Sequence, residues 1–574
     1  MNSEDNLISR VYSGFRGVDF RGEEINLIRS PDSLNVWKDY RETESIRTRP
    51  EMELSVAFTD AVYGVFFYAD MMLVHSGTKL YKVVKKYNAK PYKADNITKT
   101  ELFSGLNAMP SNAFVYDDVW YFKDGKHYLQ YDGKEIKAVE GYVPTVSIAR
   151  SPKGSGKDHE DANFLTNRRI NTFLGDGESK EYFLSYRNID NSVAPIVKVL
   201  NEQGKWDDKT DFAVDYADGK ITFETPPGKP FTDGQDNVSI EFAYTKEEYK
   251  TVIPNCTLLQ VFDNRVFFAG NPEYPNTIFH CSLNDPTYCS DLDYYNEGLD
   301  AAKVKGMVAG NNALWVFREP SDSNTTVFYH TPTIDEEYGK IYPNTHSSIT
   351  TGCIGKAVNF NDDIVFFSER GMEGISGDVT TEQVLGHRST LVDRKMIAEK
   401  NYADMILEEW EGYLLVFIGN KVYLADSRAV FTNENHVEYD WFYWEFDKSI
   451  TCAKVDNDIL YLGTKDGVYT LTDNESAVKS YWVTPKDKFK HPHKLKTTNK
   501  RGCVVEATGD ISVYAKLEDT DFELIGAYEN ITDYFVSRIK RKKFKDIQLK
   551  FYSNTRFSLE TVTLEAFIGG YIKR

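Results

Sequence analysis

A hairpin-like pattern recurs about every 48 residues along this chain, and this period constrains the fold more than any single motif does. Each copy is a short apolar run, a turn of Asp, Asn or Gly, and a second apolar run rich in Phe, Tyr and Val. The first turns of the copies fall near residues 70, 118, 264, 312, 362, 411 and 457. Short strands joined by tight turns at this period are typical of four-stranded propeller blades. The sequence therefore predicts an all-β protein with a β-propeller of about seven blades.

One step between the turns, from about 118 to 264, is longer than the others by roughly 100 residues, which predicts a separate module inserted between two blades. Within it, TDFAVDYADGKITFETPPG places two alternating strands around Asp218-Gly219, a good hairpin turn, and predicts a small β-sandwich. We expect an extended N-terminal arm at 1–55, blades at 56–148, the inserted module at 149–253, further blades at 254–478 and a β-rich C-terminal domain at 479–574.

Composition adds limits on the class of protein. No apolar run of 18 residues occurs, and the N-terminus has no basic segment leading into an apolar stretch. We therefore expect a protein without membrane insertion of its own and without a cleaved signal. The cysteines show no CxxC and no paired spacing, so they are predicted to be reduced core thiols. They are Cys256, Cys281, Cys289, Cys353, Cys452 and Cys503.

Charge is distributed unevenly along the chain. The net charge is −19, but residues 481–574 hold 18 of the 68 Lys and Arg residues and only 12 of the 87 Asp and Glu residues. Residues 1–480 therefore carry 25 excess negative charges. An acidic body with a basic end argues against duplex-DNA binding by the body and favours electrostatic pairing between the ends of the chain or between subunits.

Each candidate motif for phosphate binding, metal binding or catalysis lacks at least one residue that it requires. In SPKGSGKD, Ser151 stands where a phosphate-binding loop needs its first Gly, and Asp158 stands where it needs Ser or Thr. His491 and His493 lie among lysines with no further metal ligand nearby. Val468 occupies the place of a Gly in the nearest match to a sialidase Asp-box. The sequence therefore predicts no catalytic residues, no metal site and no cofactor, and hence a protein that is not an enzyme.

Two segments are predicted to make interfaces. The arm holds few apolar residues spaced for a core, yet it contains Phe15, Phe20, Trp37 and Tyr40, which are large to leave in water. We expect these four side chains to dock, either across the chain's own propeller or on a neighbouring protein. The second segment is SRIKRKKFK, in which the interface candidates are Arg538, Lys540, Arg541, Lys543 and Lys545. Alternatively, this basic run only protects an edge strand from aggregation.

The N-terminal strings GFRGVDF, RSPDSLNVWKDY and SIRTRPEME resemble the opening of tail nozzle proteins of short-tailed bacteriophages, the tail tubular protein B type. In that family a Pro-Asp and Asn-rich segment leads to an Arg-Pro pair just before the propeller. Here these residues are Pro31, Asp32, Asn35, Arg49 and Pro50. The segment LLQVFDNRVFFAGNPEYPNTIFHCSLNDPTYCSDLDYY is similar to the family's segment just after the insertion, and IGGYIKR matches the C-terminal end more loosely.

This resemblance implies a structural virion protein, made in the cytoplasm of the host bacterium and located in the phage tail. It implies a homohexameric ring at the distal end of a short tail, attached to the adaptor and portal assembly, contacting tail fibres and enclosing the DNA exit channel. DNA would pass without specific binding. Contacts between basic side chains and phosphates hold DNA through counterion release, and acidic walls avoid such contacts.

Other readings of the sequence stay open. The C-terminal domain is also compatible with relatives such as the muzzle or stabilisation proteins of gut phages. An alternative virion propeller is a receptor-binding adhesin, whose aromatic side chains would stack on glycans. A glycan-active tail enzyme is a further alternative, and it would need a pocket with two converging carboxylates.

Overall fold

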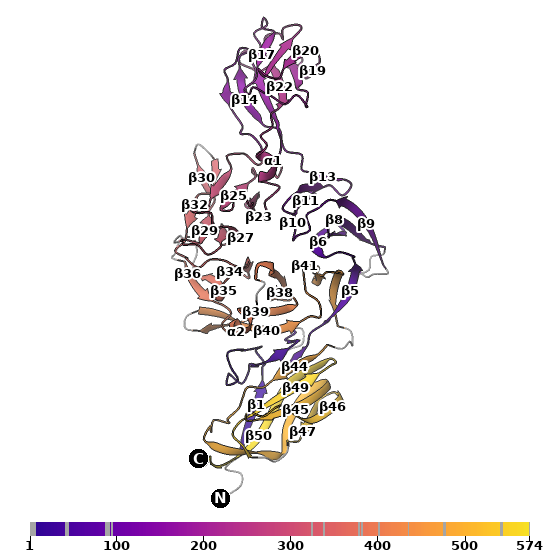
Figure 1. The fold of residues 1–574 in the computed structure, drawn as a ribbon, viewed down its shortest axis with the longest axis vertical. Coiled ribbons are helices and arrows are strands. Elements are labelled where there is room, and N and C mark those ends of the chain that lie inside the picture. Colours follow the sequence, from indigo (N-terminus) through magenta and orange to yellow (C-terminus); the bar gives the residue numbers. More distant parts are fainter. Residues whose placement is uncertain are drawn as a thin grey trace. The chain divides into compact units, whose positions relative to one another are not determined.

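The chain is almost entirely β-structure in a computed structural model (Figure 1). The structure describes residues 7–40, 45–86, 92, 96–322, 325–336, 339–376, 379, 383–399, 402–433, 436–473, 478–539 and 543–572. Helical structure in this part of the chain is limited to α1 (Tyr249–Val252), α2 (Asp393–Met396) and a 3₁₀ turn (Tyr402–Asp404). None of these helices is long and apolar enough to span a membrane.

The chain divides into two compact units. Unit 1 comprises residues 1–104, 319–327 and 346–574, and unit 2 comprises residues 105–318 and 328–345. Seven four-stranded sheets are present in the described residues, and each corresponds to one predicted blade. The predicted all-β propeller class is therefore confirmed.

Unit 1 contains four of these blades. Their strands are β6 (Val62–Tyr68), β7 (Met71–Ser76), β8 (Lys79–Lys85) and β9 (Ile97–Ser104); β33 (Ala357–Phe360), β34 (Asp363–Ser368), β35 (Gly371–Ser376) and β36 (Val384–His387); β37 (Ile406–Trp410), β38 (Tyr413–Ile418), β39 (Lys421–Asn433) and β40 (His436–Glu445); and β41 (Cys452–Asp456), β42 (Ile459–Gly463) and β43 (Gly467–Thr472) with β5 (Glu51–Ala57).

Unit 2 contains the other three blades and a small hairpin. The blade strands are β10 (Asn112–Tyr116), β11 (Val119–Lys123), β12 (Tyr128–Tyr131) and β13 (Ile136–Ala138); β23 (Leu258–Phe262), β24 (Arg265–Ala269), β25 (Thr277–His280) and β26 (Tyr294–Asn296); and β27 (Val304–Gly310), β28 (Ala313–Arg318), β29 (Val327–His330) and β32 (Asn344–His346). The hairpin is β30 (Thr333–Asp335) with β31 (Gly339–Ile341).

The turns inside the blades explain why the repeat is visible in the sequence. Five of them place two consecutive residues at φ between 47° and 64°, namely Asp117-Asp118, Asp263-Asn264, Asn311-Asn312, Asn361-Asp362 and Asn457-Asp458. A two-residue hairpin turn that matches the twist of its strands needs φ above zero at both positions, and Asn and Asp tolerate that conformation best after Gly. The polar pairs are therefore required by backbone geometry.

The insertion is a two-sheet β-module in unit 2. One sheet contains β14 (Thr145–Arg150), β15 (Lys157–Asp158), β16 (Arg168–Phe173), β18 (Ile196–Leu200), β19 (Trp206–Lys209) and β22 (Val238–Ala243), and the other contains β17 (Glu181–Phe183), β20 (Phe212–Asp215) and β21 (Lys220–Phe223). Its boundaries differ from the expected 149–253, since β14 begins at Thr145. Val252 and Ile253 pack instead with blade residues such as Tyr121 and Phe268.

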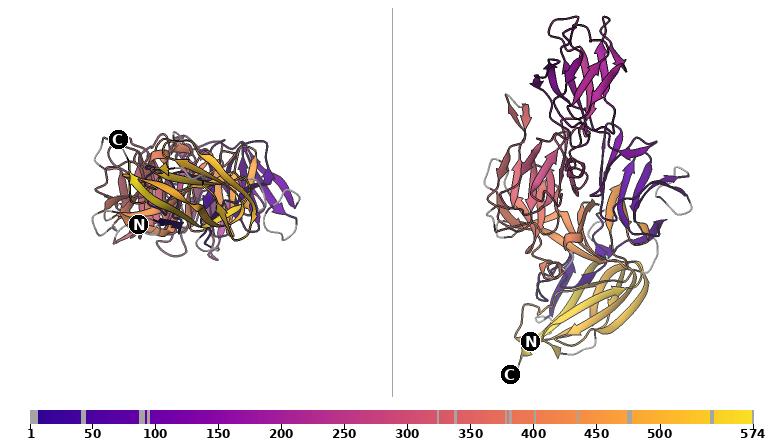
Figure 2. Two further views of the ribbon diagram at one scale, coloured as in Figure 1. Left: turned by 90° about the horizontal axis from the view of Figure 1, so that it is seen from below. Right: turned by 45° about the horizontal axis from the view of Figure 1, so that its top comes forward.

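The C-terminal domain is an eleven-stranded sheet that includes N-terminal strands (Figure 2). Its strands are β1 (Leu7–Ser13), β2 (Ser33–Leu34), β3 (Val36–Trp37), β4 (Ile46–Thr48), β44 (Ser480–Val483), β45 (Lys494–Leu517), β46 (Glu523–Ile531), β47 (Tyr534–Ser537), β48 (Lys543–Phe544), β49 (Ile547–Ser553) and β50 (Phe557–Tyr571). Within the segment expected as an extended N-terminal arm, β1 pairs with β50 and β5 completes the last blade, so these strands belong to the C-terminal sheet and to a blade.

The two sheets of the inserted module enclose a core made only of module residues, including Phe173, Tyr182, Ile221 and Phe242. We therefore expect a fragment of residues 143–246 to fold alone and to unfold cooperatively in urea. Phe173→Ala should lower its free energy of unfolding by roughly 3–5 kcal/mol, because this ring is fully buried.

The matched control is Phe231→Ala, since the Phe231 ring is 81% exposed and its removal should change stability by less than about 0.5 kcal/mol. Circular dichroism during urea unfolding measures both values. A fragment without a cooperative transition would contradict an independent module.

Candidate functional site

The N-terminal segment of residues 14–50 lies within unit 1 and buries its aromatic side chains there. Trp37 stacks on Trp410 with ring centroids 5.3 Å apart. Phe15 meets Trp482 edge to face at 5.1 Å, and Phe20 meets the ring of another aromatic residue in the same way. Phe15, Phe20 and Trp37 are 1%, 4% and 1% exposed. The sequence left two docking modes open, and in the structure these aromatic side chains pack within their own unit.

Phe15, Phe20 and Trp37 therefore follow the first of the two expected modes, and their rings are buried within their own unit. Their spacing in the sequence follows no helical or strand period, because each ring fills a gap between strands that are hundreds of residues away. Tyr40 is only partly buried, and its hydroxyl donates a hydrogen bond to Asp426. The guanidinium of Arg428 lies 3.4 Å from the Tyr40 ring centroid. Burial and the Asp426 carboxylate together raise the pKa of Tyr40.

Asn35 and Arg49 form the centre of a buried joint in this segment. Asn35 has a φ of 56°, and its side-chain oxygen accepts hydrogen bonds from Arg49 Nε at 2.9 Å and from the Glu445 amide at 2.8 Å. Its Nδ2 donates to the Lys479 carbonyl at 2.9 Å. One asparagine thus ties the segment to blade strand β40 and to the residue preceding β44.

The Arg49 side chain completes the joint. Its other two nitrogens donate to the carbonyls of Pro50 at 2.7 Å and Glu445 at 3.0 Å, and its guanidinium lies 4.4 Å from the ring centroid of Phe446. Arg49 is 6% exposed, and this burial lowers its pKa to about 10. Carbonyl oxygens, an amide oxygen and an aromatic face therefore replace the water that a charged guanidinium would otherwise need.

The residues of the N-terminal resemblance gather around this joint. Asp32 accepts hydrogen bonds from the Tyr481 hydroxyl at 3.2 Å and from Lys395 Nζ at 3.4 Å. Pro31 lies between Asp32 and Ser30, and the Ser30 hydroxyl donates to the Val483 carbonyl at 2.7 Å. These contacts join the segment to α2 and to strand β44 of the C-terminal sheet, so the motif builds a structural connection.

Asp440 anchors the same segment to blade strand β40 by charge. Its side chain is 1% exposed and pairs with Arg16 at 2.5 Å and with Arg29 at 2.6 Å. Burial raises the pKa of Asp440, and the two guanidinium groups oppose that effect. A buried carboxylate held by two arginines is costly to break, because removing one partner leaves an uncompensated charge.

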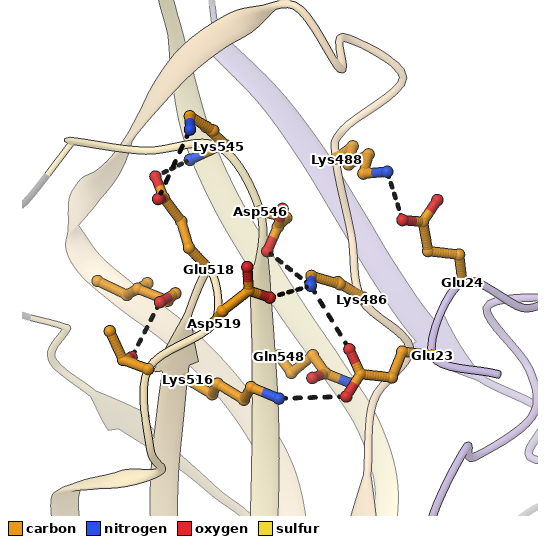
Figure 3. A network of polar contacts seen from close by, with 12 residues as sticks. Glu23, Glu24, Lys486, Lys488, Lys516, Glu518, Asp519, Lys545, Asp546 and Gln548 are labelled. Carbon is orange, nitrogen blue, oxygen red and sulfur yellow. Dashed lines mark hydrogen bonds and ion pairs between the residues drawn. The ribbon is translucent and has the colours of Figure 1, made fainter.

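Figure 3 shows a second set of ion pairs, at the surface between this segment and the C-terminal domain. Lys486 Nζ lies 2.9 Å from Asp519 and 3.5 Å from Glu23, and Lys516 lies 3.1 Å from Glu23. Lys488 pairs with Glu24. The sequence predicted that the basic end pairs either with another part of the chain or with another subunit, and these ion pairs are within the chain. Exposed pairs of this kind contribute about 0–1 kcal/mol each, so they orient the segment more than they stabilise it.

The C-terminal basic run is described only in part. Lys540 and Arg541 lie outside the described residues. Arg538 and Lys543 are exposed, and Lys543 is in strand β48, which pairs with β45. Lys545 lies 4.0 Å from Glu518 of its own chain. Their role in contacts between subunits stays a prediction.

A polar cavity of 740 Å³ lies beside the ion pairs of Figure 3. Its lining includes Asp19, Arg21, Glu23, Arg29 and Lys486, so charges of both signs face it. The Asp19 carboxylate accepts two hydrogen bonds from the Arg21 guanidinium, at 2.9 and 2.8 Å. This cavity is therefore largely charge-compensated by its own wall.

No group of three His, Cys, Asp or Glu side chains with the geometry of a metal site occurs among the described residues. All six cysteines are free, as predicted, and all but Cys452 are buried. Burial raises the pKa of Cys256 and Cys503 to about 12, which keeps both as thiols.

One cluster was missed by reading the sequence. His387 Nε2 lies 2.6 Å from Asp393, and Nδ1 lies 3.4 Å from Glu373. Burial lowers the pKa of His387, but the hydrogen bonds and charges of the two carboxylates outweigh burial and raise it to about 9. Only the register of β35 with β36, which places Glu373 opposite His387, could have revealed the cluster.

Comparisons with known proteins show only weak similarity to the folds of solved structures. No protein-family model and no curated protein matches the sequence. Among solved structures, BamB from Moraxella catarrhalis is 11% identical with a TM-score of 0.33, over 74% of this chain and 97% of that chain. The computationally designed Ika8 protein is 10% identical with a TM-score of 0.31, over 74% and 99%. PorZ from Porphyromonas gingivalis is 12% identical with a TM-score of 0.24, over 86% and 81%. These likenesses carry no information on function.

Trp37→Ala should lower the free energy of unfolding of unit 1 by roughly 3–5 kcal/mol, because a fully buried indole would leave a cavity between β38, β40 and the segment. Tyr40→Phe is the matched control, since it keeps the ring and removes only the hydroxyl that donates to Asp426, which should cost less than the loss of the indole. Denaturant unfolding followed by tryptophan fluorescence compares them. Equal stability of Trp37→Ala and the parent would contradict a structural role for the segment.

The stability of unit 1 should depend on pH through His387. Since its folded pKa of about 9 exceeds the ordinary value of 6.5, its contribution is fully present below pH 6.5 and is lost as pH rises through 9. The loss should be about 1–3 kcal/mol. His387→Gln should be less stable than the parent at pH 6, and the gap should close by pH 10 in urea unfolding. A gap that is constant with pH would overturn this assignment.

Proposed function

We propose that this chain is a structural subunit of the nozzle ring at the distal end of a short bacteriophage tail. The joint around Asn35 and Arg49 carries the proposal. It supplies a physical reason for the residues by which the N-terminus resembles nozzle proteins, since they lock the first residues of the chain to a blade and to the C-terminal sheet. A motif that serves architecture, and not chemistry, fits a protein whose task is to assemble and bear load.

Three further features support a nozzle. A β-module is inserted between two blades, and the second matching segment follows it on β23 and β24, where the resemblance expects it. Residues 1–480 carry 25 excess negative charges, and acidic walls would let DNA pass with little retention. The N-terminal segment is held by both a buried joint and surface ion pairs, which suits a subunit under mechanical stress during DNA ejection.

In this proposal the chain acts as a homo-oligomer, with a hexamer as the expected state. Its partners are the adaptor and portal assembly on one side and tail fibres on the other. The protein carries out no chemical turnover and needs no cofactor. Its place is the virion tail, after synthesis in the host cytoplasm.

The purified chain should form rings with six-fold symmetry in negative-stain electron microscopy, alone or after addition to tails that lack it. Mass photometry should show a species of six times 65.8 kDa. Arg541→Glu with Lys543→Glu should weaken the ring more at low salt than at high salt, because exposed charge pairs are screened over about 8 Å at physiological ionic strength.

Lys205→Glu, an exposed lysine in the inserted module, is the charge-matched control for the double variant. A chain that stays monomeric under all conditions and does not bind tails would overturn the proposal. A monomer or trimer that binds bacterial glycans would instead support an adhesin.

A further inference from the structure

Unit 2 contains a cavity of 510 Å³ at the base of the inserted module. One wall comes from blade strands β12 and β13 with the preceding turn. The other comes from the two connections of the module, at residues 164–167 and 244–250, and from Arg169 at the start of β16. This volume lies within the range of about 300–1,000 Å³ that is usual for small-molecule sites.

The charge of this cavity is opposite to that of the chain. Asp and Glu outnumber Lys and Arg by 87 to 68 in the whole sequence, yet no acidic residue is among the lining residues. The basic side chains that line the cavity are those of Lys126, His127, Arg169, Lys246 and Lys250. A concave surface lined by one sign of charge concentrates ligands of the opposite sign.

Carboxylates outside the lining compensate only some of these groups. Lys250 Nζ lies 2.8 Å from Glu247, and His127 Nδ1 lies 2.8 Å from Asp124. Lys246 lies 3.8 Å from Asp291, which also accepts a hydrogen bond from the Tyr249 hydroxyl. For Lys126 and Arg169, no carboxylate partner is present among the described residues.

Arg169 is the most deeply buried of these cations, and its guanidinium lies 5.1 and 5.3 Å from the ring centroids of Tyr186 and Tyr244. Its side chain is almost fully buried, at 1% exposed, and Nη1 donates to the carbonyls of Asn167 at 3.2 Å and Tyr244 at 2.5 Å. Nε is buried without a hydrogen-bond partner. Burial of a guanidinium without a counter-ion is costly, and a bound oxyanion would supply both the missing charge and a further acceptor.

Aromatic rings line the cavity beside these cations. Phe164 and Tyr249 meet edge to face with centroids 4.8 Å apart, and Tyr128 and Tyr244 are also in the lining. Leu129, Val139 and Leu165 add apolar surface. A ligand held only by charge would leave these rings unused, whereas a ring attached to the anion could lie against them.

We propose that this cavity binds a small ligand in which one carboxylate or phosphate group is attached to a ring. The anion lies near Arg169 and Lys126, and the ring packs against the aromatic lining. An acidic sugar, a sugar phosphate and a nucleoside monophosphate share this chemistry. The proposal does not depend on the nozzle function, since it concerns only residues of unit 2.

Binding to the full-length protein can be measured by isothermal titration calorimetry with glucuronic acid, glucose 6-phosphate and adenosine monophosphate. At least one of them should bind with a Kd below about 1 mM, and glucose should bind at least about tenfold more weakly. The compound that binds identifies the source of the anion. Failure of all three would overturn the proposal, and equal affinity for inorganic phosphate would overturn recognition of the ring.

Lys126→Glu should weaken binding by at least about tenfold, because it places a negative charge at the cavity. Lys126 is exposed, so this variant should fold normally. Lys134→Glu is the matched control, since Lys134 is an exposed lysine of the same blade that does not line the cavity. It should change the affinity less than about twofold.

Arg169→Gln provides a second variant, and its melting temperature shows whether it folds. It should lose binding at temperatures well below its melting temperature, because the guanidinium that would pair with the anion is removed. Equal weakening by Lys126→Glu and Lys134→Glu would show a diffuse electrostatic effect and overturn the site.

Discussion

The burial of the Arg49 guanidinium is the constraint on which the arrangement of unit 1 depends. A charge in a nearly dry environment must find acceptors with fixed positions, and here these are the side-chain oxygen of Asn35 and the carbonyls of Pro50 and Glu445. Asn35 can meet this need only in a left-handed backbone conformation, which few residues adopt as easily. These hydrogen bonds join the residues between β2 and β5 to Glu445 at the end of β40.

The hydrophobic core of unit 1 extends this constraint. Trp37, Trp410 and Trp444 form one cluster with residues of the C-terminal sheet, so the N-terminal segment, a blade and that sheet share a single core. Surface pairs such as Lys516 with Glu23 add orientation at little gain in stability. A polar joint thus specifies the register, and aromatic burial supplies most of the free energy.

The inserted module shows a different balance. Its core is closed, and its connections leave a cavity where uncompensated cations and aromatic rings meet in an otherwise acidic chain. Arg169 is buried there without a carboxylate partner among the described residues, and a bound anion would neutralise its charge. Structural roles in unit 1 and a binding role in unit 2 are therefore compatible within one chain.

The sequence by itself determined the blades, their turns, the presence of an insertion and the reduced thiols. These features depend on alternation and on turn residues such as Asp117 and Asp118, whose conformations are set within a few neighbouring residues. Only the tertiary structure decided that Trp37 is buried in its own unit, that His387 meets two carboxylates and that Lys126 and Arg169 line one cavity. The partners of Trp37 lie hundreds of residues away, and His387 meets Glu373 through the register of β35 with β36. Local periodicity contains no information about which strands meet or in which register.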